Sequence, residues 1–305
     1  MRKRSRRISP VAIIESIRNM AAGFKRNIIA LGSYLPAEIC TNFDLGADNQ
    51  WVHENLGILE RRLAAKHETV AYMGMRAAEQ ALFRAGIKPA EINAVIVSTS
   101  STSHNAPSIA CQIINMMGIQ VPAFDINAVC SGFIYGLEVA CSLPYDKVLL
   151  IATEKYSAIT DWDSRDCVYF GDGAGAVVVA HGTGTIETSL FADGKSGDAF
   201  VSEVGKKYTI KGRKVYDKAM EVLPDMIRGY KGFTVIPHQA GLVLIRYLMA
   251  AAKVDNYVTV MDRYANLASA SIPIAMAETE DVLNKPLVLV AIGSGWTWGT
   301  AIIRP

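Results

Sequence analysis

Residues 124–140 read Phe-Asp-Ile-Asn-Ala-Val-Cys-Ser-Gly-Phe-Ile-Tyr-Gly-Leu-Glu-Val-Ala, and they contain the clearest change from a strand pattern to a helix pattern in the chain. A strand-like run ends within it and an apolar helical run begins at Cys130, an arrangement typical of α/β domains. The sulfur of Cys130 would then lie at a helix N-terminus, where the helix dipole favours the thiolate over the thiol. A cysteine before an apolar helix is also common as a small core residue, so the stretch alone leaves both interpretations open.

The rest of the chain repeats this alternation of strand and helix. Short runs rich in β-branched residues predict strands at 27–31, 94–99, 147–152, 177–180, 234–236 and 287–292. Helical periodicity predicts helices near 69–85, 107–117, 131–142 and 239–253. The order of these elements predicts an α/β layered fold in which helices cover central sheets.

The composition describes a globular protein with balanced charge. The chain has 305 residues, of which 50% are hydrophobic, and can therefore bury one large core or two fused ones. Its 31 basic and 29 acidic side chains give a formal charge of +2, which argues against a nucleic-acid surface outside the N-terminal tail. No stretch approaches the roughly 20 apolar residues of a membrane helix, so we expect a soluble protein without a membrane span.

The cysteine pattern bears on metals and on the cellular compartment. The five cysteines, Cys40, Cys111, Cys130, Cys141 and Cys167, include no Cys-x-x-Cys pair. This scatter indicates neither a zinc site nor a disulfide framework. We therefore expect no bound metal and a reducing, cytoplasmic location.

The chain is predicted to consist of an extension followed by two halves. Residues 1–24 form a basic N-terminal extension, which we interpret as a disordered or peripheral segment and not as an organelle-targeting peptide. Residues 25–190 and 191–305 are the predicted halves, because a glycine-rich run leads into an apolar strand in each of them. The Gly/Lys/Ser-rich region 193–212 is the candidate mobile surface.

Two polar residues stand where predicted strands end or helices begin. His238 follows the apolar run 233–237, so its side chain can point into a cleft. Asn266 precedes a helix rich in Ala and Ser, although an asparagine there is also a common cap or turn residue. With Cys130, these residues would supply an acyl carrier and two hydrogen-bond donors for an oxygen that becomes an enolate.

Two glycine-rich stretches receive different interpretations. Residues 293–299 suit a tight turn whose amide N–H, with that of Cys130, would make an oxyanion hole, the alternative being a plain turn between strands. Residues 171–176 match Gly-x-Gly-x-x-Ala, but a strand-like Val-Val-Val-Ala follows them. A dinucleotide site needs a helix behind the glycines, so we predict a structural role for this second stretch.

The chain contains several motifs whose order matches that of one known protein family. They include Leu-Gly-Ser-Tyr-Leu-Pro at 31–36, Ala-Val-Cys-Ser-Gly-Phe at 128–133, Phe-Gly-Asp-Gly-Ala-Gly-Ala at 170–176, Pro-His-Gln-Ala at 237–240, Asn-Leu-Ala-Ser-Ala-Ser-Ile-Pro at 266–273 and Gly-Trp-Thr-Trp-Gly at 295–299. Through them the chain resembles ketoacyl-acyl-carrier-protein synthase III, a thiolase-fold condensing enzyme, over nearly all of residues 26–305. The resemblance implies a thiolase-like, duplicated five-layer α-β-α-β-α fold, a homodimer and an acyl-carrier protein as partner.

The activity implied by the resemblance is a decarboxylative Claisen condensation in fatty acid or related biosynthesis. An acyl primer, carried on coenzyme A or on acyl-carrier protein, loads Cys130. A malonyl thioester then loses carbon dioxide while His238 and Asn266 stabilise the enolate that attacks the acyl-cysteine. The N–H groups of Cys130 and Ser294 would form the oxyanion hole, and neither a metal nor a redox cofactor is required.

Positions around the implied substrate sites depart from the family pattern. Trp51 and Arg165 match the coenzyme A clamp, but Asn55 and Leu59 stand where arginines are common. The loss of two cations predicts weaker phosphate recognition. Ala106 stands where acetyl-preferring bacterial relatives usually have a phenylalanine that closes the partner's acyl channel, so a longer or bulkier primer is expected.

Carrier-protein docking is also expected to be altered. Val243 replaces a basic residue that is often found after the Pro-His-Gln-Ala motif, which leaves the nearby Arg246 as the docking candidate. The second half is shorter than in typical members, and the shortening is centred on residues 197–232.

The sequence disfavours two other functions of related enzymes and leaves two alternatives to condensation open. A degradative thiolase needs a second cysteine near its C-terminus, and no cysteine follows Cys167. Plant-type polyketide synthases do not share the glycine-rich ending. An acyltransferase of the same fold, moving the acyl group from Cys130 to a hydroxyl or amine, and a non-catalytic subunit that binds carrier protein remain the alternatives.

Overall fold

The computed structural model describes residues 24–195, 197–203 and 205–305, so the predicted extension lies almost wholly outside the described residues. The strands are β1 (Phe24–Tyr34), β2 (Glu38–Thr41), β3 (Glu60–Leu63), β4 (Ala94–Ser98), β5 (Ala123–Ile126), β6 (Lys147–Lys155), β7 (Asp172–Ala192), β8 (Phe200–Val201), β9 (Thr209–Ile210), β10 (Thr234–Pro237), β11 (Leu287–Gly293) and β12 (Thr297–Arg304). The α-helices are α2 (Asn49–Leu56), α3 (Val70–Ala85), α4 (Ile109–Met117), α5 (Gly132–Ser142), α6 (Gly212–Val222), α7 (Pro224–Ile227), α8 (Leu242–Ala252), α9 (Met261–Tyr264) and α10 (Ser271–Ala277). Four 3₁₀ turns matter for the site: η2 (Val129–Ser131), η3 (Tyr156–Ala158), η4 (Arg165–Val168) and η6 (Ala268–Ala270). All strands and helices predicted from the sequence are confirmed.

Local signals in the sequence start and stop the helices. The Thr69 side chain accepts a backbone N–H at the start of α3, and Gly86 in a left-handed conformation ends the helix. Ser108 and Gly118 do the same for α4. α5 has no side-chain cap and follows directly on η2, the turn that holds Cys130. No helix in the described ranges is both long enough and apolar enough to cross a membrane.

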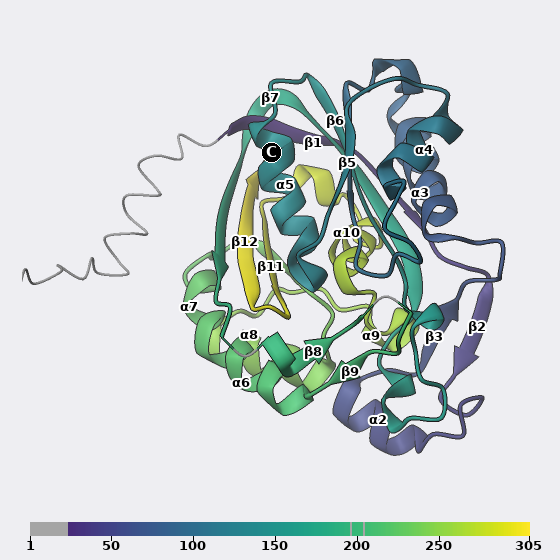
Figure 1. The fold of residues 1–305 in the computed structure, drawn as a ribbon. Coiled ribbons are helices and arrows are strands. Elements are labelled where there is room, and N and C mark those ends of the chain that lie inside the picture. Colours follow the sequence, from purple (N-terminus) through teal and green to yellow (C-terminus); the bar gives the residue numbers. More distant parts are fainter. Residues whose placement is uncertain (1–23, 196, 204) are drawn as a thin grey trace, which may run out of the picture.

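The main sheet has eight strands in the order β10-β11-β12-β7-β6-β4-β5, and β1 pairs with β7. β4 runs parallel to β5 and β6, and β10 runs parallel to β11. β7 pairs with β6 through residues 172–180 and with β12 through residues 185–192. This long strand therefore passes from one half of the sheet to the other, and α5 and α10 lie between the halves (Figure 1).

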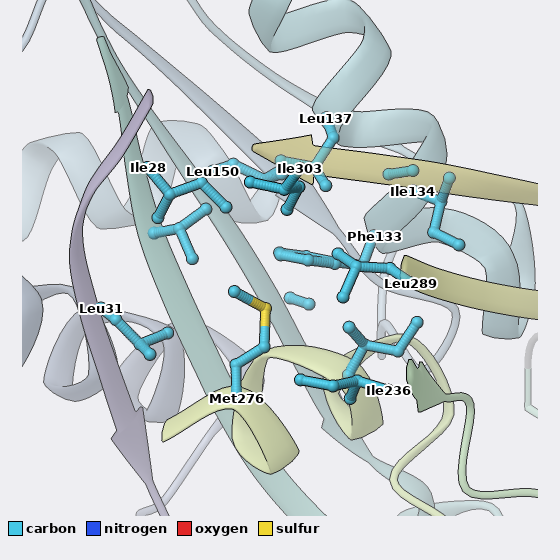
Figure 2. Close-up of a cluster of buried hydrophobic side chains, with 14 of the residues drawn as sticks. Ile28, Leu31, Phe133, Ile134, Leu137, Leu150, Ile236, Met276, Leu289 and Ile303 are labelled. Atoms are coloured by element: carbon cyan, nitrogen blue, oxygen red, sulfur yellow. The ribbon is translucent and has the colours of Figure 1, made fainter. Parts of the chain in front are cut away.

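The middle layer packs both halves of the sheet against α5 and α10. Phe133 and Leu137 of α5, Met276 of α10, Leu150 of β6 and Leu289 of β11 belong to one buried cluster (Figure 2). Because side chains alternate along a strand, the neighbours of these sheet residues face outward. β6 and β11 are thus apolar on both faces along most of their length, as expected for a sheet covered by helices on both sides.

Two further buried clusters cover the outer faces of the sheet. Val95 and Val97 of β4 pack with α3 and α4 on one side. Val288 and Val290 of β11 pack with α6, α7 and α8 on the other side. The layers therefore follow the order helix, sheet, helix, sheet, helix, which confirms the predicted five-layer α/β fold. The division between residues 190 and 191 stays a prediction.

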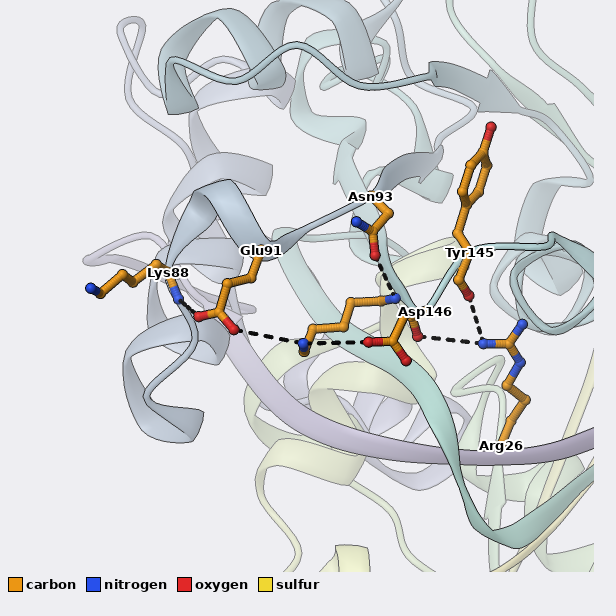
Figure 3. A network of polar contacts seen from close by, with 7 residues as sticks. Arg26, Lys88, Glu91, Asn93, Tyr145 and Asp146 are labelled. Carbon is orange, nitrogen blue, oxygen red and sulfur yellow. Dashed lines mark hydrogen bonds and ion pairs between the residues drawn. The ribbon is translucent and has the colours of Figure 1, made fainter.

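A polar network fixes the amino ends of β4 and β6 (Figure 3). The guanidinium of Arg26 on β1 donates to the carbonyl oxygen of Tyr145 at 2.7 Å. The N–H of Lys147 donates to the side chain of Asn93 at 2.9 Å, and its ammonium lies 3.6 Å from the carboxylate of Glu91. The opposite, carboxyl ends of these strands lead into the loops described next.

Candidate active site

Cys130 lies where β5 meets α5, at the carboxyl ends of the parallel strands. The chain reaches it through Val129, whose φ of 48° lies in the left-handed region. That conformation is strained for a β-branched residue and persists only where the surrounding contacts enforce it, most often at functional sites. Cys130 is partly buried and packs against a cluster that contains Ala268.

The turn after β11 closes on the backbone of Cys130. A Cβ atom at Gly293 would lie 2.7 Å from the carbonyl oxygen of Ala128 and 3.0 Å from the amide nitrogen of Cys130, so only glycine permits this approach. The hydroxyl of Thr297 donates to the same carbonyl oxygen of Ala128 at 3.1 Å. Ser294 comes next in the chain, directly after the residue that contacts the amide of Cys130.

The surroundings of Cys130 raise the pKa of its thiol. Burial raises its pKa well above the ordinary value and the negative charge of Glu154 raises it further, while a backbone N–H acts in the opposite direction. The expectation that the helix start would favour the thiolate is wrong here, because the loss of hydration outweighs the N–H at that position. A base must therefore accept the thiol proton when Cys130 attacks.

His238 follows β10 and lies at the same end of the sheet. Its backbone N–H donates to the carbonyl oxygen of Val290 on β11 at 2.8 Å, three residues before Gly293. Burial lowers the pKa of the imidazole to about 3, so the ring is neutral at physiological pH. A neutral imidazole has one N–H to donate and one lone pair that can accept a proton. Its Nδ1 atom has no hydrogen-bond partner among the described residues.

Gln239, which the sequence analysis did not single out, fixes the segment that carries His238. Its side chain is fully buried, donates to the carbonyl oxygen of Pro237 at 2.7 Å and accepts the N–H of Val260 at 2.9 Å. These bonds join the end of β10 to the segment that leads through α9 to Asn266. The side chain of Gln239 therefore connects the segment that carries His238 with the segment that leads to Asn266.

The amide of Asn266 is oriented by its own turn. Its Oδ1 atom accepts the N–H of Ala268 at 2.8 Å, which leaves the NH₂ group free to donate to a ligand. Its backbone N–H donates to the carbonyl oxygen of Tyr169 at 3.1 Å, and its carbonyl oxygen accepts the N–H of Gly171 at 3.1 Å. Ala265 and Ala268 have φ values of 55° and 44°, so this turn is strained like the one before Cys130.

Trp51 and Arg165 meet at the edge of a cleft formed by the α2 and η4 segments. The guanidinium carbon of Arg165 lies 4.4 Å from the centre of the Trp51 ring, and the cleft has a volume of about 450 Å³. The side chain of Asn55 donates to the backbone of Trp51 at 2.8 Å, and Leu59 is 42% exposed. Neither Asn55 nor Leu59 carries a cation, and neither lines the cleft itself.

The remaining predicted positions lie on the surface. Ala106 is exposed in the loop between β4 and α4, so it does not line the site of its own chain. Arg246 is exposed on α8 and borders a hollow of about 420 Å³ together with Val243 and Tyr247. In the part of the chain that the structure describes, no group of three His, Cys, Asp or Glu side chains is placed to hold a metal ion.

An aromatic cluster beside Cys130 was not predicted. Tyr156 stacks on Phe170 with ring centres 4.3 Å apart, and Phe200 stacks on Tyr208 with ring centres 5.6 Å apart. All four rings belong to the cluster that Cys130 packs against. They come from four separate segments, so no local sequence pattern signals the cluster.

This fold and this site define the class of the protein. A strained cysteine turn, a neutral buried histidine and an oriented asparagine amide lie at one end of a five-layer α-β-α-β-α core. The molecule is a thiolase-fold condensing enzyme.

Comparison with known proteins identifies the family. Two models of 3-oxoacyl-[acyl-carrier-protein] synthase III, one of them C-terminal, match residues 124–194 and 233–305. Beta-ketoacyl-[acyl-carrier-protein] synthase III of Rickettsia canadensis is 33% identical over 312 residues, which cover 91% of this chain and 98% of that protein. A Vibrio vulnificus relative of the same name is 36% identical over 318 residues, with the same coverage. The chain belongs to the beta-ketoacyl-[acyl-carrier-protein] synthase III family.

Solved structures agree with this assignment. The 3-oxoacyl-[acyl-carrier-protein] synthase III of Aquifex aeolicus matches with a TM-score of 0.87 and 34% identity over 92% of this chain and 100% of that one. The enzyme of Thermus thermophilus matches with a TM-score of 0.86 and 29% identity over 92% of this chain and 99% of that one. The predicted family, fold and enzyme class, a condensing acyltransferase of fatty acid biosynthesis, are confirmed.

Proposed function

We propose that Cys130, His238 and Asn266 are the catalytic residues of this condensing enzyme, and that a malonyl thioester extends an acyl primer held on Cys130. The observation that carries the proposal is the position of the Cys130 turn, which contacts Gly293 at the end of β11 and lies against η6, the turn that follows Asn266, while the backbone of His238 is bonded to β11. No metal or redox group takes part in the proposed steps.

The first step transfers the primer to the enzyme. The sulfur of Cys130 attacks the carbonyl carbon of the primer thioester, and the neutral imidazole of His238 accepts the thiol proton. The C–S bond to the carrier then breaks, and its thiolate leaves with that proton. His238 is the proposed acceptor because its ring is neutral and its Nδ1 atom has no partner among the described residues, and the proton passes on to the leaving thiolate in the same step.

The second step forms the new carbon–carbon bond. The malonyl C–CO₂ bond breaks and its electron pair forms a thioester enolate, whose oxygen accepts hydrogen bonds from His238 and from the Asn266 amide. The enolate carbon attacks the acyl carbon on Cys130, and the C–S bond to Cys130 breaks. The released Cys130 thiolate takes up one proton from solvent, which balances the negative charge that the malonyl carboxylate brought in and returns the enzyme to its starting state.

The tetrahedral oxygen formed in each attack needs its own donors. The amides of Cys130 and Ser294 are suited to this role, because Gly293 holds the two backbones together. The hydroxyl of Ser294 donates to the carbonyl oxygen of Phe200 at 2.8 Å, and the amide N–H of Ser294 stays available. Product analysis with a malonyl carrier tests the proposal, since acyl transfer without condensation would yield no 3-oxoacyl product.

Acyl-carrier protein is the proposed partner, and a homodimer the proposed assembly. Arg246 is exposed on α8 and could pair with an acidic carrier surface. β5 is the last strand of the sheet order, so one of its edges pairs with no strand among the described residues and suits pairing with a second copy. Trp51 and Arg165 would hold the pantetheine or nucleotide part of the substrate.

A primer on coenzyme A should load Cys130 more slowly than the same primer on carrier protein. Asn55 and Leu59 offer no cation beside the cleft of Trp51 and Arg165, and each missing charge-assisted contact removes about 1.5–3 kcal/mol of binding. Loading rates of one acyl group on the two carriers measure the difference. The variant Asn55→Arg/Leu59→Arg should raise loading from coenzyme A, whereas a wild type that already prefers coenzyme A strongly would contradict this prediction.

Primers longer or bulkier than acetyl should be favoured. In a dimer, the exposed loop at Ala106 would place a methyl group, in place of a phenylalanine ring, against the acyl channel of the neighbouring subunit. The space left by the ring can hold further methylenes of the primer, each of which contributes about 0.8 kcal/mol of binding when buried. Ala106→Phe should therefore lose long primers and keep acetyl, while Ala106→Ser should behave like wild type. Loading rates for a series of acyl primers of increasing length check this prediction. A wild type restricted to acetyl would contradict it and would show that another side chain closes the channel. Tyr156 and Phe170, in the cluster beside Cys130, are the candidates for that side chain.

A further inference from the structure

The carboxylate of Glu154, at the carboxyl end of β6, is fully buried near the site and has no part in the chemistry proposed above. A buried carboxylate is costly unless donors surround it. Glu154 has such a cage: the hydroxyls of Ser101 and Ser269 each donate at 2.6 Å, and the N–H of Ser100 donates at 3.1 Å. These donors come from two segments that are distant in sequence from β6.

The two hydroxyl contacts reach different parts of the molecule. Ser101 lies at the start of the loop between β4 and α4, and its oxygen accepts the N–H of Lys155 at 2.8 Å, so its own proton is directed at Glu154. Ser269 lies in η6, immediately after Ala268, whose N–H holds the side chain of Asn266. The bond to Ser269 therefore connects Glu154 with the turn that orients Asn266.

That turn is strained and must be held from both sides. Upstream, the backbone of Asn266 is paired with Tyr169 and Gly171. Downstream, Ala268 has a φ of 44°, and the single hydroxyl proton of the next residue, Ser269, has two acceptors within reach, Glu154 at 2.6 Å and the carbonyl oxygen of Ser98 at 3.3 Å. A strained conformation persists only when its surroundings over-determine it. The 2.6 Å contact with a buried carboxylate is the shorter of these two downstream anchors.

We infer that Glu154 is a positioning residue for condensation, which fixes the Asn266 amide by anchoring Ser269. The inference rests on the proposed role of Asn266 in stabilising the enolate. The inference assigns no such role to Ser101. The hydroxyl of Ser101 makes the same type of bond to the same carboxylate, but Ser101 belongs to another segment. Ser101 is therefore a matched control within the chain.

The test compares Ser269→Ala with Ser101→Ala in two assays on the full-length protein: acylation of Cys130 by a primer thioester, and decarboxylation of malonyl thioester. Ser269→Ala should keep the acylation rate and lose decarboxylation by a factor on the order of 100, the scale expected for a donor displaced by about 1 Å. Ser101→Ala should keep both. Equal losses in the two variants would overturn the inference, because they would show that the cage supports only the fold.

A double variant shows whether Ser269 acts through Asn266. In an Asn266→Ala background, Ser269→Ala should cause no further loss of the decarboxylation rate. A loss as large as in the wild-type background would overturn the inference. If Ser269→Ala does not fold, Glu154→Gln replaces it with decarboxylation as the readout, because loss of the Glu154 charge also lowers the pKa of the Cys130 thiol and so affects acylation. Failure of both variants to fold would also overturn the proposed role. A wild type that neither acylates Cys130 nor decarboxylates malonyl thioester would refute the proposed function itself, a result distinct from all of these.

Discussion

Replacing Cys130 by alanine should abolish both acyl-enzyme formation and condensation while the protein stays folded. The sulfur is the only atom removed, and the strained turn is held by Gly293 and Thr297, which the substitution leaves in place. The measurement is 3-oxoacyl product formed from a primer and malonyl carrier, with thermal unfolding as the check of the fold.

Cys141→Ala is the matched control for this experiment. Cys141 is also buried. It lies near the end of α5 and belongs to the buried cluster between the two halves of the sheet. It should keep its activity, apart from a loss of stability typical of a small cavity. Condensation that persists in Cys130→Ala would mean that the acyl group is carried elsewhere.

Replacing Asn266 by alanine should leave loading of Cys130 intact and reduce malonyl decarboxylation by about 10²–10³, the usual effect of removing one oxyanion donor. His238→Ala should slow both half-reactions, because His238 accepts the thiol proton in loading and donates to the enolate in condensation. Single-turnover acylation and release of carbon dioxide separate the two steps. An Asn266→Ala variant that condensed at the wild-type rate would contradict the division of roles.

Much of the fold could be predicted because its signals are local. The apolar strand runs, the Thr69 and Ser108 caps and the glycines after α3 and α4 all act over a few residues. The strand that follows Gly171-Asp-Gly was also predicted correctly, and β7 shows why those glycines are no dinucleotide site. The three polar candidates could be found because each follows a predicted strand or precedes a predicted helix.

The rest of the site depends on residues that meet only in three dimensions. The helix start at Cys130 is visible in the sequence, but the desolvation and the charge of Glu154 that reverse its effect on the pKa are not. The stacking of Phe200 and Tyr208 beside Cys130 likewise joins the region 193–212 to the nucleophile. An acidic residue at the end of an apolar strand, as in Ala-Thr-Glu154, was the one local hint at the buried carboxylate.

Intact-mass analysis of the wild-type protein with a panel of primer thioesters tests the central claim most directly. We predict a single mass increase equal to that of the acyl group, located by peptide mapping in residues 128–133 and discharged when malonyl carrier is added. Absence of acylation by every thioester, or an acyl group found on a residue other than Cys130, would contradict the account.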